Sequence, residues 1–208
     1  MKTTLLQLKT SIFSGDGQSS RLADSFVTQW RTANPGAEII VRDLARDPVP
    51  HLDAQRFGAF IAKPESRTPA QRALVDYSDE LIGELKRADV IVLGLPMYNF
   101  GVPSTLKAYF DHVARAGETF RYTDKGPRGL LTGKKAYLFA TRGGKYAGTA
   151  DFETGFVRQF LQFVGIDDVE FIYAEGLAMG DASRQAALTA AEGAIDRLLA
   201  SAHWPIAA

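Results

Sequence analysis

Short runs of strand-like residues alternate with longer stretches of helical spacing along this chain of 208 residues. The runs that we expect to be strands are Thr4–Leu8, Glu38–Asp43, Asp89–Leu95, Lys134–Thr141 and Val169–Ala174. The expected helices are Arg21–Ala33, Ala54–Ala62, Pro69–Ala88, Ser104–Ala114, Asp151–Val164 and Ser183–Ala202. This alternation is typical of a mostly parallel sheet with helices on both faces. Since no repeat, low-complexity segment or shift in composition divides the chain, we expect one α/β domain over residues 1–208.

Composition excludes several classes of function. The chain has 24 basic and 24 acidic residues, and this balance argues against nucleic acid or an anionic membrane as the main partner. There is no cysteine, which rules out disulfides and thiolate chemistry. The histidines His51, His112 and His203 lie far apart in the sequence, so no metal site is expected. No signal peptide and no apolar run of membrane-spanning length is evident, and we expect a cytoplasmic protein.

The most informative segment follows the third expected strand. It reads Pro96-Met97-Tyr98-Asn99-Phe100-Gly101-Val102-Pro103 and leads into the helix that begins near Ser104. Open α/β sheets bind ligands in loops at the carboxyl ends of their strands. Two prolines and a glycine shape this loop, while Met97, Tyr98 and Phe100 give it flat apolar surface. These residues suit a planar aromatic ring better than a metal or a phosphate.

The loop after the first expected strand, residues 11–21, has features of a phosphate site. Backbone N–H groups at the start of a helix attract anions. The hydroxyls of Ser11, Ser19 and Ser20 and the Gln18 amide add neutral donors. The pattern matches neither GxGxxG nor GxxxxGK[ST], and the absence of a lysine favours a monophosphate. The alternative is that Ser19 or Ser20 simply caps the helix.

After the fourth expected strand comes Thr141-Arg142-Gly143-Gly144. Two adjacent glycines let the backbone approach a ligand closely, although an ordinary turn would explain this segment if it stood alone. In a parallel sheet, the loops after the first, third and fourth strands meet at one edge. A phosphate site and an aromatic-ring site, without an adenine fingerprint, point to FMN as the cofactor.

With these motifs, and with Phe110-Asp111 and the stretch from Gly117 to Thr123, the chain resembles the FMN-dependent NAD(P)H azoreductases over its whole length. These enzymes are also described as NAD(P)H:quinone oxidoreductases of the flavodoxin-like superfamily. The resemblance implies a three-layer α/β/α sandwich with a five-stranded parallel sheet of order 2-1-3-4-5. It also implies a homodimer with one FMN per subunit and active sites at the interface. The stripe Phe152, Phe156, Phe160 and Phe163 is accordingly expected in the core or the dimer interface.

The resemblance also assigns roles to residues. It implies that Ser11, Gln18, Ser19 and Ser20 bind the phosphate of FMN. This chain has Gly17 at a position where family members often carry a serine. The residues implied to contact one side of the flavin ring are Pro96, Met97, Tyr98, Asn99 and Phe100, and those implied to contact the other side are Thr141, Arg142, Gly143 and Gly144. The residues implied to line the substrate pocket are Phe120, Tyr122 and the stretch Arg56–Phe60, in part from the partner subunit. Tyr122 is a candidate general acid, although solvent could supply the proton.

The implied activity is hydride transfer from NADH or NADPH to the flavin and then to a quinone or an azo compound. One pocket used twice predicts ping-pong kinetics, and full cleavage of an azo bond to amines needs two rounds. A flavodoxin-type electron carrier is an alternative, but such carriers are usually strongly acidic. The same motifs are compatible with an NAD(P)H-dependent FMN reductase, and the fold alone with a binding module that has lost its cofactor.

Overall fold

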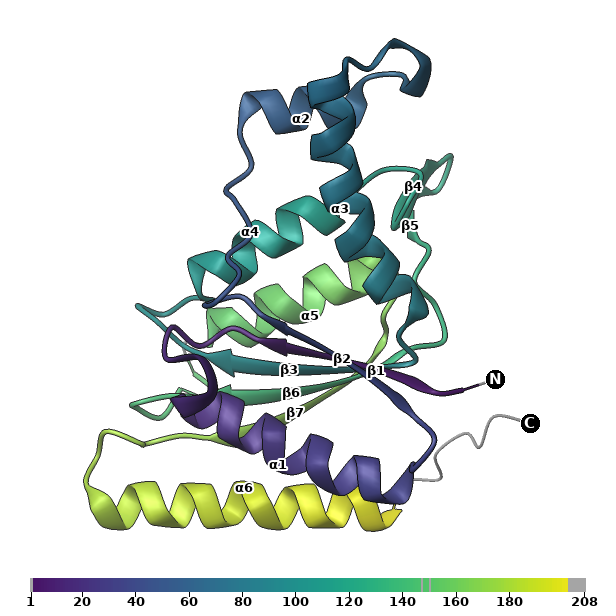
Figure 1. Ribbon diagram of the computed structural model, residues 1–208. Coiled ribbons are helices and arrows are strands. Elements are labelled where there is room, and N and C mark those ends of the chain that lie inside the picture. Colours follow the sequence, from purple (N-terminus) through teal and green to yellow (C-terminus); the bar gives the residue numbers. More distant parts are fainter. Residues whose placement is uncertain (1, 147, 150, 202–208) are drawn as a thin grey trace.

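Five parallel strands form the central sheet of the computed structural model, which describes residues 2–146, 148–149 and 151–201 (Figure 1). The strands are β1 (Thr4–Lys9), β2 (Glu38–Asp43), β3 (Val90–Pro96), β6 (Lys135–Thr141) and β7 (Asp168–Ala174). Their order is β2-β1-β3-β6-β7, and every neighbouring pair is parallel. Since β6 and β7 are the fourth and fifth strands of this sheet, the expected order 2-1-3-4-5 is confirmed.

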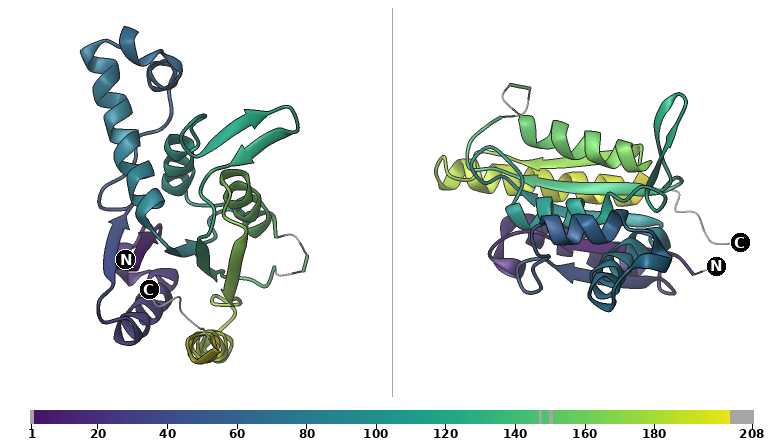
Figure 2. Two further views of the ribbon diagram at one scale, coloured as in Figure 1. Left: turned by 90° about the vertical axis from the view of Figure 1, so that its right-hand side faces the viewer. Right: turned by 90° about the horizontal axis from the view of Figure 1, so that it is seen from above.

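Helices cover both faces of the sheet (Figures 1 and 2). One face carries α1 (Gln18–Ala33) and α6 (Asp181–Ser201), and the other carries α3 (Pro69–Arg87), α4 (Ser104–Val113) and α5 (Phe152–Val164). The short helix α2 (Ala54–Ile61) packs on α3. Ala202, the expected last residue of α6, lies outside the described residues. Within the described ranges, no helix is long and apolar enough to cross a membrane.

Each face of the sheet has its own apolar core, because alternate side chains of a strand point to opposite faces. Toward α1 and α6 lie the buried residues Leu5, Val92 and Phe139, and they contact the buried face of α1 that Phe26 and Trp30 belong to. The spacing of these apolar residues in α1 predicts that face correctly. Full burial of a side chain of this size stabilises the fold by roughly 1.5–3 kcal/mol.

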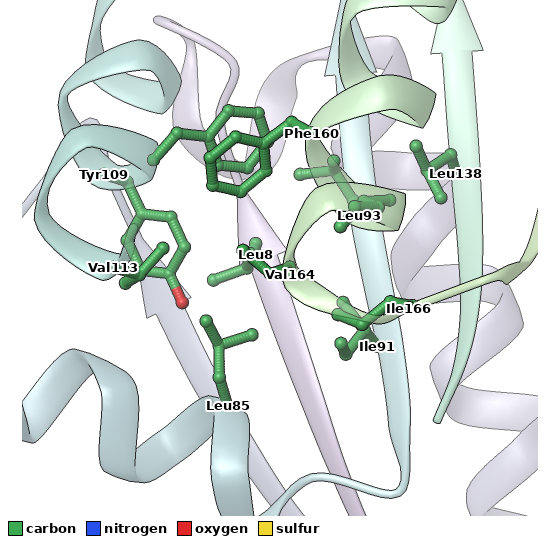
Figure 3. A pocket seen from close by; sticks show the side chains of 12 residues that line it. Leu8, Leu85, Ile91, Leu93, Tyr109, Val113, Leu138, Phe160, Val164 and Ile166 are labelled. Carbon is green, nitrogen blue, oxygen red and sulfur yellow. The ribbon is translucent and has the colours of Figure 1, made fainter. Parts of the chain in front are cut away.

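The opposite core contains a closed pocket of about 10 Å³ between the sheet and α3, α4 and α5 (Figure 3). Its walls are apolar side chains, among them Leu85, Val113 and Phe160, and the ring of Tyr109 lies against them. The Tyr109 hydroxyl is buried without a hydrogen-bond partner among the described atoms, and burial raises the pKa of this phenol. The space is too small for an organic ligand, so the binding site must be sought elsewhere.

Two local features differ from the sequence-based expectation. Helix α1 begins at Gln18 rather than Arg21, so that Ser19 and Ser20 belong to its first turn and not to the loop. The hairpin of β4 (Phe120–Thr123) and β5 (Gly126–Gly129) was not expected at all. Its strands are short and mostly exposed, so they carry little of the apolar alternation that identifies a strand. The hairpin lies beside the end of α5, where Leu131 N–H donates to the Val164 carbonyl at 2.8 Å.

Candidate functional site

The loops after β1, β3 and β6 meet at the edge where the parallel strands end, and they surround an open pocket of about 360 Å³. The expected site residues that line it are Ser11, Gly17, Gln18, Pro96, Met97, Tyr98, Thr141, Arg142 and Gly143. The other lining residues are Phe13, Asp16, Leu177 and Arg184. The meeting of the three loops agrees with the expectation for a parallel sheet.

The start of α1 forms one wall of this pocket. Gly17 is the N-cap residue and makes no side-chain capping bond, which excludes the alternative that Ser19 or Ser20 caps the helix. Both serines are fully buried in the first turn, and their hydroxyls have no partner among the described residues. Gly17 and Gln18 line the pocket, and the N–H groups of the first turn, which begins at Gln18, have no side-chain cap. Such N–H groups are the donors that bind anions at helix N-termini.

Gly94 in β3 determines how closely α1 approaches the sheet. A Cβ atom at this position would lie 3.2 Å from the carbonyl carbon and oxygen of Ser19. The Gly94 carbonyl also accepts a hydrogen bond of 2.6 Å from the Thr10 hydroxyl, at the start of the first loop. A glycine inside a strand often marks such a close backbone approach. The helix terminus and the first loop are therefore both placed by this one residue.

Gly17 allows the first loop to fold against Ser11. A Cβ atom at Gly17 would lie 2.1 Å from Ser11 Oγ and 2.5 Å from Ser11 Cβ. A serine at position 17 would therefore require the Ser11 side chain and its backbone to move. The observed loop geometry therefore requires a residue without a side chain at position 17.

Tyr98 joins two of the three loops. Its hydroxyl lies 3.2 Å from Ser11 Oγ and accepts a hydrogen bond from the Ile12 N–H at 3.3 Å. Next to it, the Met97 N–H donates to the Thr141 carbonyl at 3.0 Å and ties the loop after β3 to the end of β6. These bonds hold the pocket walls at fixed separations, although the loops come from distant parts of the sequence.

Asn99 and Phe100 form a tight two-residue turn. Tyr98 and Gly101 exchange two backbone hydrogen bonds of 3.0 and 3.1 Å, and the φ angles between them are 49° for Asn99 and 66° for Phe100. Two positive φ angles are typical of a type I′ turn, which favours Asn-Gly. A phenylalanine in this conformation is strained, and such strain is concentrated at functional sites. The Phe100 ring is 61% exposed and lies edge-on to Tyr146.

A second pocket of about 470 Å³ is lined by Phe100 and by the end of the same loop. Its lining is mostly apolar and consists of His51, Phe100, Gly101, Val102, Ser104, Lys107, Phe152, Glu153 and Phe156. Phe152 is 74% exposed and Phe156 36% exposed, whereas Phe160 stacks on Phe110 at 3.8 Å. The phenylalanine stripe of α5 therefore changes from a surface to a core feature along the helix.

Arg142 is the centre of a buried ionic cluster behind the loop after β6. Its Nη1 atom lies 2.8 Å from Asp151 Oδ2 and 3.2 Å from Glu175 Oε1, and its Nη2 atom lies 3.6 Å from Glu153 Oε2. Burial acts to raise the pKa of Asp151, but hydrogen bonds from Thr154 and Arg142 hold it below its usual value. For Glu153, burial dominates and raises the pKa to about 8. The four side chains connect the ends of β6 and β7 to the start of α5.

Several expected site residues do not line the first pocket. Asn99 and Gly144 belong to the correct loops but lie outside its lining, and Phe100 lines only the second pocket. Phe120 and Tyr122 belong to the hairpin, which lies at the end of the sheet opposite the first pocket (Figure 1). Phe120 packs on Phe163 of α5, and Tyr122 is 75% exposed. The Arg56–Phe60 stretch lies on α2 and borders neither pocket. The expected role of the hairpin and of α2 in the substrate pocket therefore stays a prediction.

Leu177 and Arg184 are pocket residues that the sequence-based analysis missed. They belong to the segment after β7 and to the first turns of α6. The Arg184 guanidinium is exposed and makes no ion pair within the described ranges. The fifth parallel strand ends at the same edge as the others, and this rule could have drawn attention to the segment that follows it.

Comparison with known proteins gives concordant results. The family model described as flavodoxin-like fold matches residues 3–199. An FMN-dependent NADH:quinone oxidoreductase of Cellvibrio japonicus is 56% identical over 178 residues, which cover 85% of this chain and 89% of that protein. FMN-dependent NADH:quinone oxidoreductase 6 of Burkholderia lata is 52% identical, with 93% and 98% covered. The structure of an FMN-dependent NADH-azoreductase from Bacillus anthracis in complex with FMN has a TM-score of 0.83 and 26% identity, with 96% and 100% covered.

Proposed function

The chain belongs to the flavodoxin-like fold family and, within it, to the FMN-dependent NADH:quinone oxidoreductases, and from this premise we propose that it reduces quinones and azo compounds with electrons from NADH. FMN is the cofactor, and when bound it supplies the acceptance and release of a hydride. The preference for NADH over NADPH rests on the names of the relatives.

One observation carries the proposal: an uncapped helix N-terminus and the rigid loops after β3 and β6 line a single pocket. The backbone N–H groups of the first turn of α1, which begins at Gln18, would bind the phosphate of FMN, and Arg184 would add a cation at the rim. Pro96, Met97 and Tyr98 would contact one side of the flavin ring. Thr141, Arg142 and Gly143 would face the other side, where a backbone donor such as the Gly143 N–H favours negative charge.

The electron acceptor would bind on the exposed face of the same site. Phe100 lines the second pocket, and its exposed ring offers a flat apolar surface to a quinone or an azo dye. If donor and acceptor use this surface in turn, the reaction is ping-pong, and an azo bond needs two rounds of reduction. Quinones are the simpler substrates because one round suffices.

We further propose that the active protein is a homodimer. Phe100, Phe152 and Phe156 form an exposed apolar surface beside the site. Apolar patches of this kind on soluble proteins mark interaction sites. A second copy would cover this surface and could bring the hairpin residues Phe120 and Tyr122 to the pocket, where the resemblance places them.

Steady-state kinetics test the proposed reaction. We expect NADH oxidation by a quinone to give parallel double-reciprocal lines when both concentrations are varied, with FMN bound throughout. Intersecting lines would contradict alternating use of one pocket. Turnover that requires a continuous supply of free FMN would instead indicate a flavin reductase, in which FMN is the substrate.

A further inference from the structure

Glu153 lies between the two pockets and has no role in the function proposed above. Its side chain is 1% exposed, it borders the second pocket, and Arg142 of the first pocket lies 3.6 Å away. Neither of its carboxylate oxygens accepts a hydrogen bond from a described residue. A buried carboxyl group without hydrogen bonds is costly when ionised, so its presence at this place requires a reason.

The cation next to Glu153 is already paired with two other carboxylates. Arg142 Nη1 contacts Asp151, which is also the N-cap of α5, at 2.8 Å, and it contacts Glu175 at 3.2 Å. With Asp151 and Glu175 ionised, two negative charges already face one fully buried guanidinium, and an ionised Glu153 would add a third. A proton on Glu153 therefore limits the excess of negative charge in the cluster.

The charged groups around Glu153 come from several elements. Arg142 faces it from the end of β6, Asp151 from the start of α5, and Glu175 contacts the same guanidinium from the segment after β7. His51 and Lys107 line the same pocket, but Lys107 is paired with Asp111 at 2.6 Å. Burial raises the pKa of Glu153 to about 8, although the charge of Arg142 acts in the opposite direction and that of Asp151 adds to the rise. At pH 7 the carboxyl group is thus mostly neutral.

Arg142 transmits the state of this cluster to the pocket. Its backbone N–H donates to the Ala174 carbonyl at 3.0 Å, and its carbonyl accepts from the Leu177 N–H at 3.0 Å. Its guanidinium also lies over the Tyr173 ring, 5.1 Å from the centroid. Because Thr141, Arg142 and Gly143 form the pocket wall, a displacement of the guanidinium would displace the wall that faces the cofactor.

We propose that Glu153 is a positioning residue for the FMN-binding loop, that it acts through Arg142, and that it does so in its neutral form. This inference rests on the proposed function, since FMN is the ligand of that loop. An ionised Glu153 competes with Asp151 and Glu175 for Arg142, loosens the loop and adds negative charge beside a site for an anionic cofactor. The affinity for FMN therefore falls as pH rises through the pKa of Glu153.

The first experiment measures FMN binding by flavin fluorescence in the wild type and in Glu153→Gln between pH 7 and 9. The phosphate of FMN is fully charged in this range, since its second pKa is about 6. We expect the affinity of the wild type to fall about fivefold over this range, which follows if bound FMN raises the pKa of Glu153 by one unit, and that of E153Q to stay constant. Glu65→Gln makes the same chemical change at an exposed position far from the pocket and should follow the wild type.

The second experiment measures the thermal midpoint of the FMN-free proteins against pH. The pKa of Glu153 is raised in the folded state from 4.5 to about 8, so the stability that its proton provides is complete below pH 4.5 and is lost as pH rises to 8. E153Q is neutral at every pH. Its midpoint should exceed that of the wild type by a margin that grows from pH 5 to 8 and is constant above.

The two experiments separate the outcomes. FMN binding with the same pH dependence in the wild type and E153Q would overturn the role of Glu153 but leave the proposed function intact. Absence of FMN binding in all variants would overturn the proposed function and this inference with it. Glu153→Met is a second neutral variant, and failure of both neutral variants to fold would also overturn the claim that the neutral form is the working one.

Discussion

Phe100 shows at the scale of one residue how the chain trades stability for a binding surface. Its φ of 66° is a conformation that side chains with a Cβ atom avoid and that glycine adopts freely. The sequence predicts that Phe100 belongs to the ligand loop, because it adds flat apolar surface to a segment shaped by two prolines and a glycine. The strained backbone could not be predicted, since the local preference of phenylalanine points to an extended conformation.

We expect Phe100→Gly to be more stable than Phe100→Ala. Both variants remove the ring, but only glycine relieves the strain, and the difference in unfolding free energy should be about 1 kcal/mol. Urea unfolding of the FMN-free proteins measures it. Both variants should lose quinone reductase activity, because the flat surface is gone. Equal stability of the two variants would show that the turn is not strained.

Tyr109 is a second residue whose state can be tested. Its hydroxyl lies in an apolar pocket of about 10 Å³, which is at the lower limit for a water molecule and offers no other polar group (Figure 3). Tyr109→Phe should therefore raise the unfolding free energy by about 1 kcal/mol. Tyr98→Phe is the matched change at a hydroxyl with partners and should lower it by a similar amount. A loss of stability in Y109F would mean that the hydroxyl is hydrogen-bonded after all.

At the scale of elements, the strands and long helices follow from the sequence because each has the periodicity of its class. β2, for example, has the expected bounds, and α3 ends one residue before the predicted Ala88. The start of α1 was placed three residues too late, because Gln18, Ser19 and Ser20 are as frequent in loops as in a first helical turn. The orphaned hydroxyls of the two serines are a tertiary property that no local pattern contains.

Gly94 gives a test of how the elements define the site. Gly94→Ala should push α1 away from β3, which costs about 1–3 kcal/mol of stability, and it should weaken FMN binding several-fold because the helix N-terminus moves. Gly83→Ala in α3 is the control, since its nearest neighbour is a flexible arginine at 3.6 Å. It should be neutral or raise stability by about 0.5–1 kcal/mol. Unchanged FMN affinity in G94A would contradict the assignment of the helix terminus to the phosphate.

At the scale of the whole molecule, one copy of the chain forms the pocket but leaves its surroundings incomplete. Phe120 and Tyr122 lie at the far end of the sheet, although the resemblance assigns them to the substrate pocket. The proposed homodimer would reconcile these two observations. The residues are assigned to the pocket only through the resemblance, and a contact between copies would leave no periodic pattern within one chain.

The dimer predicts a specific effect at the exposed end of α5. Phe152→Glu places a charge in the apolar surface beside the site and should convert the dimer to a monomer with little activity. Val41→Glu makes a similar change on the outer strand β2 and should leave the dimer intact. Sedimentation velocity at several concentrations measures both. A monomeric wild type would refute the dimer, and a dimeric F152E would place the interface elsewhere.

The proposed function depends above all on alternating reduction and oxidation of bound FMN. We would follow the visible absorbance of the FMN-loaded protein without oxygen, add one equivalent of NADH, and then add one equivalent of a quinone. We expect the flavin bands to disappear with NADH and to return with the quinone while FMN stays bound. Bands that do not change with NADH, or that return only after FMN has dissociated, would contradict the proposed function.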